Sequence, residues 1–118
     1  MNWAGFVGLM FGMGVGHAVV DCVLQDPGLF QMGRLKQVGS RWADGSLHWP
    51  YWLLAHGLLN GWAVAIVTDS PILGIAETGA HVGIDLGKMR GLYGVHVDQA
   101  AHWACKVAWA YITIKGGV

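Results

Sequence analysis

Hydrophobic residues along the chain gather in four runs, which polar connections separate. We place the runs at Trp3 to Leu24, Trp49 to Thr68, Ile72 to Gly87 and His96 to Ile114. An α-helix rises about 1.5 Å per residue, so the longest runs would extend about 30 Å, the thickness of the bilayer hydrocarbon layer. The third run is shorter and would need a locally thinner bilayer or burial against its neighbours. The pattern predicts an all-α fold, a four-helix transmembrane bundle in which residues 1–118 form one domain.

The long first connection begins with a turn signal, Gln25-Asp26-Pro27-Gly28, and continues with apolar residues at loose helical spacing. A short interfacial amphipathic helix and a plain loop both fit this pattern. The start of the chain lacks the basic region and the cleavage site of a signal peptide, so we expect the first run to stay in the mature protein.

Basic residues occur mainly in two of the connections. They are Arg34, Lys36 and Arg41 in the first connection and Lys88 and Arg90 in the third. In a chain with four spans these two connections lie on the same side, and basic connections face the cytoplasm. We therefore expect a protein of the bacterial inner membrane with both termini facing outward.

Composition supports a lipid environment and excludes one large class of partner. Of 118 residues, 54% are hydrophobic and only 12% are charged, about half of the roughly 25% charge of soluble domains. The net charge is zero, so the chain lacks the basic surface of a nucleic-acid-binding protein. Cys22 and Cys105 show neither a CxxC spacing nor the density of a disulfide scaffold.

Glycines recur at every fourth position within three of the runs. They are Gly8, Gly12 and Gly16, then Gly57 and Gly61, then Gly79, Gly83 and Gly87. Small residues at this spacing allow helices to approach closely in lipid. The pattern predicts a tight contact at each of the three stripes.

Ionisable residues lie inside the runs at the same spacing of four. The stripes are His17, Asp21 and Gln25; His56 and Asn60; Glu77, His81 and Asp85; and Asp98 and His102. Each stripe occupies one helix face. With the topology above, the four histidines lie about 10 Å below the cytoplasmic boundary and three aspartates about 4 Å below it, while Asn60 and Glu77 lie a turn deeper. Ionisable groups at such depth face a bundle interior, a cavity or one another.

Converging histidines and carboxylates are the usual ligands of a divalent metal. The predicted ligands are His17, Asp21, His56, His81, Asp85 and His102, and the set suits zinc, manganese or iron. Glu77 or Asp98 is the predicted general base, or alternatively a residue that orients a ligating histidine. A structural polar network and a proton or ion path remain open readings. Lys106 could reach the interface, pair with an acid or contact an anionic ligand.

Four stretches of the chain resemble a family of small membrane proteins of unknown function from bacteria and their phages. They are Gly16 to Gln25, Trp49 to His56, Glu77 to Asp85 and Asp98 to His102. The resemblance implies a polytopic helical protein of the inner membrane, without an established activity. The His-x3-Asp stripes are also similar to those of membrane-bound metal-dependent hydrolases.

Three hypotheses follow for the function. The first is a metal-dependent hydrolase that acts on a membrane-proximal substrate. The second is a non-enzymatic phage or bacterial membrane factor that binds a host or virion protein. The third is a proton or ion conductor. The lipid bilayer is the expected partner, a homo-oligomer is an open alternative, and no nucleic acid is expected.

Overall fold

The computed structural model describes residues 2–23 and 49–116. Helix α1 (Trp3–Ala18) continues into a π-helical turn, η1 (Val19–Val23), and is followed by α3 (Trp49–Thr68), α4 (Pro71–Met89) and α5 (Val95–Ile114). These residues contain no strand, so the predicted all-α class is confirmed. Helix α3 matches its predicted run, and α4 is longer than predicted by one residue at its start and two at its end. The predicted interfacial helix of the first connection lies outside the described residues.

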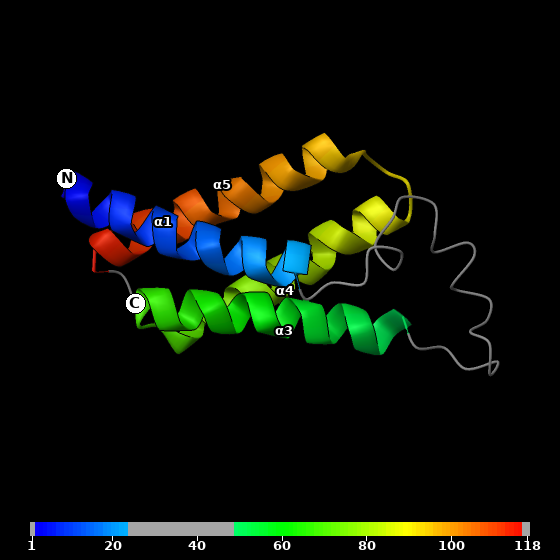
Figure 1. Ribbon diagram of the computed structural model, residues 1–118, viewed down its shortest axis with the longest axis horizontal. Helices are drawn as coiled ribbons and strands as arrows, with labels where there is room; N and C mark the ends of the chain where they lie inside the picture. Colours follow the sequence, from blue (N-terminus) through cyan, green and yellow to red (C-terminus); the bar gives the residue numbers. More distant parts are fainter. Residues whose placement is uncertain (1, 24–48, 117–118) are drawn as a thin grey trace.

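The helices form an antiparallel up-and-down bundle (Figure 1). Helix α1 contacts α3 and α5, and α4 contacts the same two helices from the other side. The start of α1 and the end of α5 therefore lie at one end of the bundle, and the start of α3 lies at the other (Figure 1). Each helix can turn one face toward a common interior.

Local sequence signals explain where the helices begin and end. The Asn2 side chain accepts a hydrogen bond from the Gly5 amide at the start of α1, and Ser70 does the same for the Leu73 amide before Pro71 starts α4. Such caps satisfy amides that have no partner within the helix. After α4, Gly91 adopts φ 76°, the left-handed conformation that glycine accepts at a helix end.

Close approach of α3 and α4 depends on glycine. A Cβ atom on Gly61 would overlap Thr78 Oγ1 and the Gly74 carbonyl oxygen, and a Cβ on Gly57 would overlap Val82. Gly12 and Gly16 lie in the same way against Val67 and Ala63 of α3. The predicted tight contacts are thus present at these positions.

The prediction of a third glycine contact is wrong for most of its stripe. Gly79 and Gly83 have no atom within 4 Å of an added Cβ, while Gly87 lies against Tyr93 in the α4–α5 connection. The reason is the rotation of α4, which turns Glu77, His81 and Asp85 inward, so that Gly79 and Gly83, which alternate with them, face outward.

The bundle has an unusually polar interior and an apolar exterior. Among the side chains that the structure describes, eleven polar or charged ones are buried, against seven hydrophobic ones. Large apolar side chains such as Phe11, Ile75 and Trp62 are exposed, at 73%, 74% and 65%. Water-soluble proteins show the opposite distribution.

By length and composition, one helix of the described residues, Trp3–Asp21, is apolar enough to cross a membrane, and Leu53–Thr68 is a shorter apolar helix. The prediction of four spans is therefore met by this criterion in α1 alone. The interior-facing acids, histidines and lysines of α4 and α5 lower the mean hydropathy of these helices, although their outer faces are apolar.

Candidate metal centre

Four histidines, one from each long helix, meet in the interior of the bundle. The ring centroid of His81 in α4 lies 4.0 Å from that of His102, 4.9 Å from that of His56 and 5.7 Å from that of His17. All four side chains are buried. Histidines that are far apart in the sequence therefore form one cluster at one level of the bundle.

His56, His81 and Asp85 present three ligand atoms to one point. The two Nε2 atoms of His56 and His81 lie 3.1 Å apart, and Asp85 Oδ2 lies 3.4 Å from each of them. Ligand atoms around a tetrahedral zinc ion with bonds of about 2.0 to 2.1 Å are about 3.3 to 3.4 Å apart. This triangle matches one face of such a tetrahedron.

The Asp85 oxygen in this triangle has no hydrogen-bond partner among the described residues, although it is buried. A buried carboxylate oxygen without a hydrogen bond is costly, because it has lost the hydrogen bonds that water made to it. A cation bonded to this oxygen would remove the cost. The donor set and the unsatisfied oxygen both fit a divalent metal.

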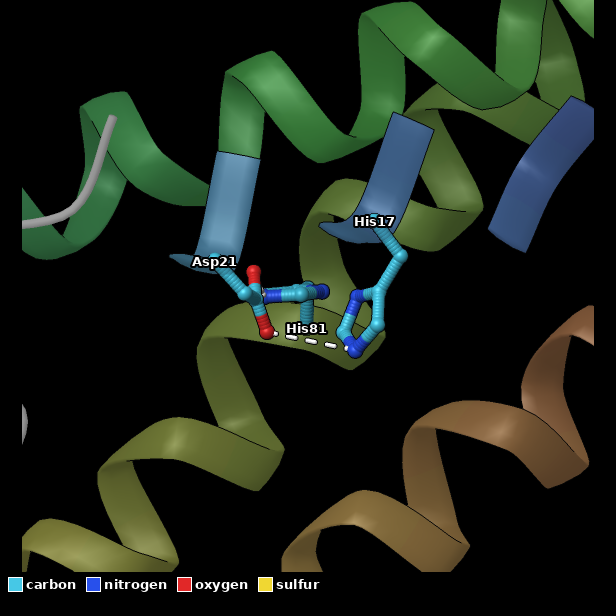
Figure 2. Close-up of side chains that lie close together, drawn as sticks. All are labelled: His17, Asp21 and His81. Atoms are coloured by element: carbon cyan, nitrogen blue, oxygen red, sulfur yellow. Dashed lines mark ion pairs between the residues drawn. The ribbon is translucent and has the colours of Figure 1, made fainter. Parts of the chain in front are cut away.

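Asp21 and His17 extend the cluster toward α1. Asp21 Oδ1 lies 3.1 Å from His56 Nε2 and 3.6 Å from His81 Nε2, and its other oxygen lies 3.2 Å from His17 Nε2. Figure 2 shows His17 and Asp21 reaching from successive turns toward His81 of α4. Asp21 lies in the π-helical turn η1, a local geometry that often occurs at functional sites. His17, Asp21 and His81 could also hold a metal ion.

Glu77 orients His81 from the side away from the triangle. Its Oε1 lies 3.2 Å from His81 Nδ1, so that nitrogen can donate a proton to the carboxylate and leave the Nε2 lone pair for a metal. Lys106 donates to the same oxygen at 2.8 Å, and Trp109 Nε1 donates to Oε2 at 2.6 Å. Of the three alternatives for Lys106, the structure shows pairing with an acid.

Asn60 and Gln99 connect the cluster by hydrogen bonds. The Asn60 amide nitrogen lies 3.1 Å from both Asp21 Oδ1 and His81 Nε2, and its oxygen lies 3.4 Å from His17 Nδ1. Gln99 lies 3.2 Å from His17 and donates to Asp98 Oδ2 at 3.1 Å. An unprotonated His81 Nε2 can accept from the Asn60 amide or bind a metal, but its single lone pair cannot do both at once.

Asp98, His102 and Lys88 form the other side of the cluster. His102 Nε2 lies 3.1 Å from Asp85 Oδ1 and 3.7 Å from Asp98 Oδ1. Lys88 Nζ lies 3.0 Å from Asp98 Oδ2 and 3.8 Å from Asp85 Oδ1. Asp98 Oδ1 and His102 Nδ1 are buried without a hydrogen-bond partner among the described residues.

Tyr93 joins the α4–α5 connection to this side of the cluster. Its hydroxyl donates to the Ile84 carbonyl oxygen. Burial, with the nearby carboxylates of Asp98 and Asp85, raises the pKa of the Tyr93 hydroxyl. The hydroxyl therefore stays protonated and serves as a donor at neutral pH.

The structure brings all six predicted metal ligands into one cluster, with Glu77 and Asp98 beside them. The roles assigned to these residues stay predictions. Gln99, Lys88 and Trp109 had no predicted role at the site. The signal for Trp109 was its position three residues after Lys106, which places both side chains on one face of α5.

No protein-family model, curated protein or solved structure matches the chain.

Proposed function

We propose that the protein binds a divalent metal ion through His56, His81 and Asp85 and uses a metal-bound water for hydrolysis. Zinc is the first candidate for this ion. The observation that carries the proposal is the triangle of three ligand atoms with edges of 3.1 to 3.4 Å. The unsatisfied Asp85 oxygen at one corner supports it. Manganese and iron accept the same nitrogen and oxygen donors.

The charge of the cluster also supports one divalent cation. Among the residues that the structure describes, the four carboxylates of Asp21, Glu77, Asp85 and Asp98 have two ammonium groups as partners, those of Lys88 and Lys106, besides the histidines. When the histidines serve as metal ligands they are neutral, and the four carboxylates then exceed the two ammonium groups by two negative charges. One divalent ion balances them, which matters because an unpaired charge in a medium of low dielectric constant is strongly unfavourable.

Three protein ligands leave a coordination position for water, the arrangement of catalytic zinc sites. The metal lowers the pKa of that water and supplies hydroxide at neutral pH. The Asp21 side chain is 12% exposed, more than those of Glu77, Asp85 and Asp98, and its Oδ1 lies beside both histidine ligand atoms. We assign Asp21 the role of proton acceptor and Glu77 that of orienting His81.

We further propose that the bundle resides in a membrane, with the metal centre toward the cytoplasmic face and both termini outside. The exposed apolar residues and the polar interior support this placement. A hydrolase of this kind would act on a membrane-proximal substrate. Recovery of the full chain in the soluble fraction without detergent would contradict the placement.

Metal content tests the proposal directly. We expect about one equivalent of zinc, manganese or iron in the full chain purified in mild detergent, and none in His81→Ala. His96→Ala is the matched control, because His96 is exposed at the start of α5 and should keep the metal. Absence of stoichiometric metal from the unaltered protein, also after incubation with zinc, would refute the proposal.

Cobalt substitution tests the open coordination position. Azide should change the visible spectrum of the cobalt-loaded protein, because it can replace the bound water. Asp21→Asn should keep the metal and this response but lose hydrolysis. If Asp21→Asn instead loses the metal, Asp21 is a ligand rather than the proton acceptor.

A structural polar network is the second candidate, favoured by the hydrogen bonds that run from Gln99 through His17 and Asn60 to His81. In that case the protein is a membrane factor that presents its outer surface to a host or virion protein. His81→Ala would then reduce stability while the metal content of the unaltered protein is already zero.

A further inference from the structure

The carboxylate of Asp85 faces two different sets of side chains with its two oxygens. Oδ2 lies 3.4 Å from Nε2 of both His56 and His81, the triangle described above. Oδ1 lies 3.1 Å from His102 Nε2. One carboxylate directed at two sets of ligands is the arrangement of a bridging ligand between two ions, which lie about 3.5 to 4 Å apart in two-metal sites.

The second set consists of Asp85, Asp98 and His102, whose ligand atoms all lie within 4.8 Å of one another. Their side chains are 3%, 0% and 1% exposed. Asp98 Oδ1 lies 3.7 Å from His102 Nε2 and has no hydrogen-bond partner among the described residues. A fully buried, unsatisfied carboxylate oxygen beside an imidazole nitrogen indicates a missing cation more strongly than an acidic cluster alone.

Lys88 compensates this set only in part. Its ammonium group lies 3.0 Å from Asp98 Oδ2 and 3.8 Å from Asp85 Oδ1. Gln99 also donates to Asp98 Oδ2. Both donors therefore hold one oxygen of Asp98 and leave the other for a further partner.

We propose that Asp85 bridges two divalent cations, the second of which is held by Asp98 and His102 and binds together with a phosphate-type anion. This inference rests on the proposed function, because the first cation occupies the site of His56, His81 and Asp85. One divalent cation already balances the buried charge of the cluster. A second leaves two positive charges, which a doubly charged anion neutralises.

The requirement for an anion identifies the substrate class as phosphate esters. Two cations at this spacing can bind the non-bridging oxygens of one phosphoryl group and the attacking hydroxide. The hydroxide would form a bond to phosphorus while the bond from phosphorus to the ester oxygen breaks, and the leaving alcohol would receive the proton that Asp21 accepted from water. The net reaction consumes one water and releases phosphate and alcohol.

Manganese titration of the full chain in detergent tests the second site, with electron paramagnetic resonance as the readout. We expect two equivalents of bound manganese and a magnetically coupled spectrum, because a carboxylate bridge couples the two ions. Phosphate should lower the dissociation constant of the second ion about tenfold relative to chloride at equal ionic strength, since the two ligands bind together. An unchanged constant would overturn the anion requirement.

Asp98→Asn should bind one equivalent and give the spectrum of an isolated ion. Asp69→Asn is the matched control: Asp69 is an exposed acid in the α3–α4 turn, and its φ of 53° suits asparagine. This control should keep both ions and their coupling. His102→Ala provides a second variant with the same expected loss, should Asp98→Asn fail to fold.

The outcomes separate this inference from the proposed function. One equivalent in the unaltered protein would overturn the second site and leave the first intact. Two uncoupled ions, or two ions in Asp98→Asn, would place the second ion elsewhere and also overturn it. Binding of neither manganese nor zinc would refute both proposals.

Discussion

The interior of the bundle changes character partway along every helix. At the end near the start of α1, the core is an apolar layer of Met13, Val64, Leu73 and Ala110. One helical turn farther along, the same faces carry His17, Asn60, Glu77 and Lys106. The four-residue step is the same on both sides of this change, so both halves belong to one continuous set of helix faces.

The two halves contribute differently to the protein. Buried apolar side chains stabilise by close packing, and removal of one leaves a cavity. Buried ion pairs offset much of their attraction by lost hydration and add little net stability. The apolar half therefore holds the helices together, and under the proposed function a bound cation would stabilise the polar half.

Of the substitutions in the polar half of the interior, Asp85→Asn is expected to have the largest effect on metal binding. Asparagine has nearly the same shape but cannot supply the charged oxygens that face His56, His81 and His102. We expect the metal content to fall to zero, measured by elemental analysis. Retention of metal in this variant would contradict both proposed sites.

The matched change in the apolar half is Leu73→Ala, which removes a buried side chain from the same helix. We expect a loss of about 2 to 5 kcal/mol in the free energy of unfolding. Metal stoichiometry should stay unchanged in the folded protein. Thermal unfolding and elemental analysis on one preparation measure both, and a selective loss of metal would show that the halves are not separable.

Glu77→Gln probes the orientation of His81. Glutamine keeps the size of the side chain but weakens the hydrogen bond to His81 Nδ1, so we expect a 10- to 100-fold weaker metal affinity. The double variant Glu77→Gln with Lys106→Met removes the unpaired ammonium as well and should recover stability but not affinity. Recovery of affinity in the double variant would mean that Glu77 serves only to balance Lys106.

The smallest effect is expected for Gly83→Ala, on the outer face of α4 between His81 and Asp85. An added Cβ meets no atom within 4 Å, and alanine favours a helix over glycine by up to about 1 kcal/mol. We expect unchanged metal content and equal or slightly higher thermal stability. Gly61→Ala, which would overlap Thr78 and Gly74, should be destabilising by the same assay.

The helices and the polar stripes were predictable from the sequence because both follow local rules. The run Trp49 to Thr68 matches α3 in full, and the spacing of His81 from Glu77 and Asp85 placed the three residues on one face. The third glycine stripe was predicted wrongly. Spacing identifies a stripe but not the direction in which it faces. In α4 it is Glu77, His81 and Asp85 that face the interior.

Mean hydropathy alone does not decide whether α4 and α5 cross a membrane, because it averages an apolar outer face with a polar inner one. Helix α5 combines exposed Val107 and Tyr111 with buried Asp98, His102 and Lys106. The amino-acid sequence contains both faces, and the tertiary structure shows which of them is enclosed.

The sequence by itself determined the number of long helices described, their caps and the composition of each polar face, since these depend on residues within a few positions of one another. Only the tertiary structure decided which atoms meet. His56 reaches His81, Lys106 and Trp109 reach Glu77, and Asp85 turns one oxygen to each side of the cluster. Those pairings depend on the rotation and register of neighbouring helices, which side-chain packing such as that at Gly61 and Gly74 determines.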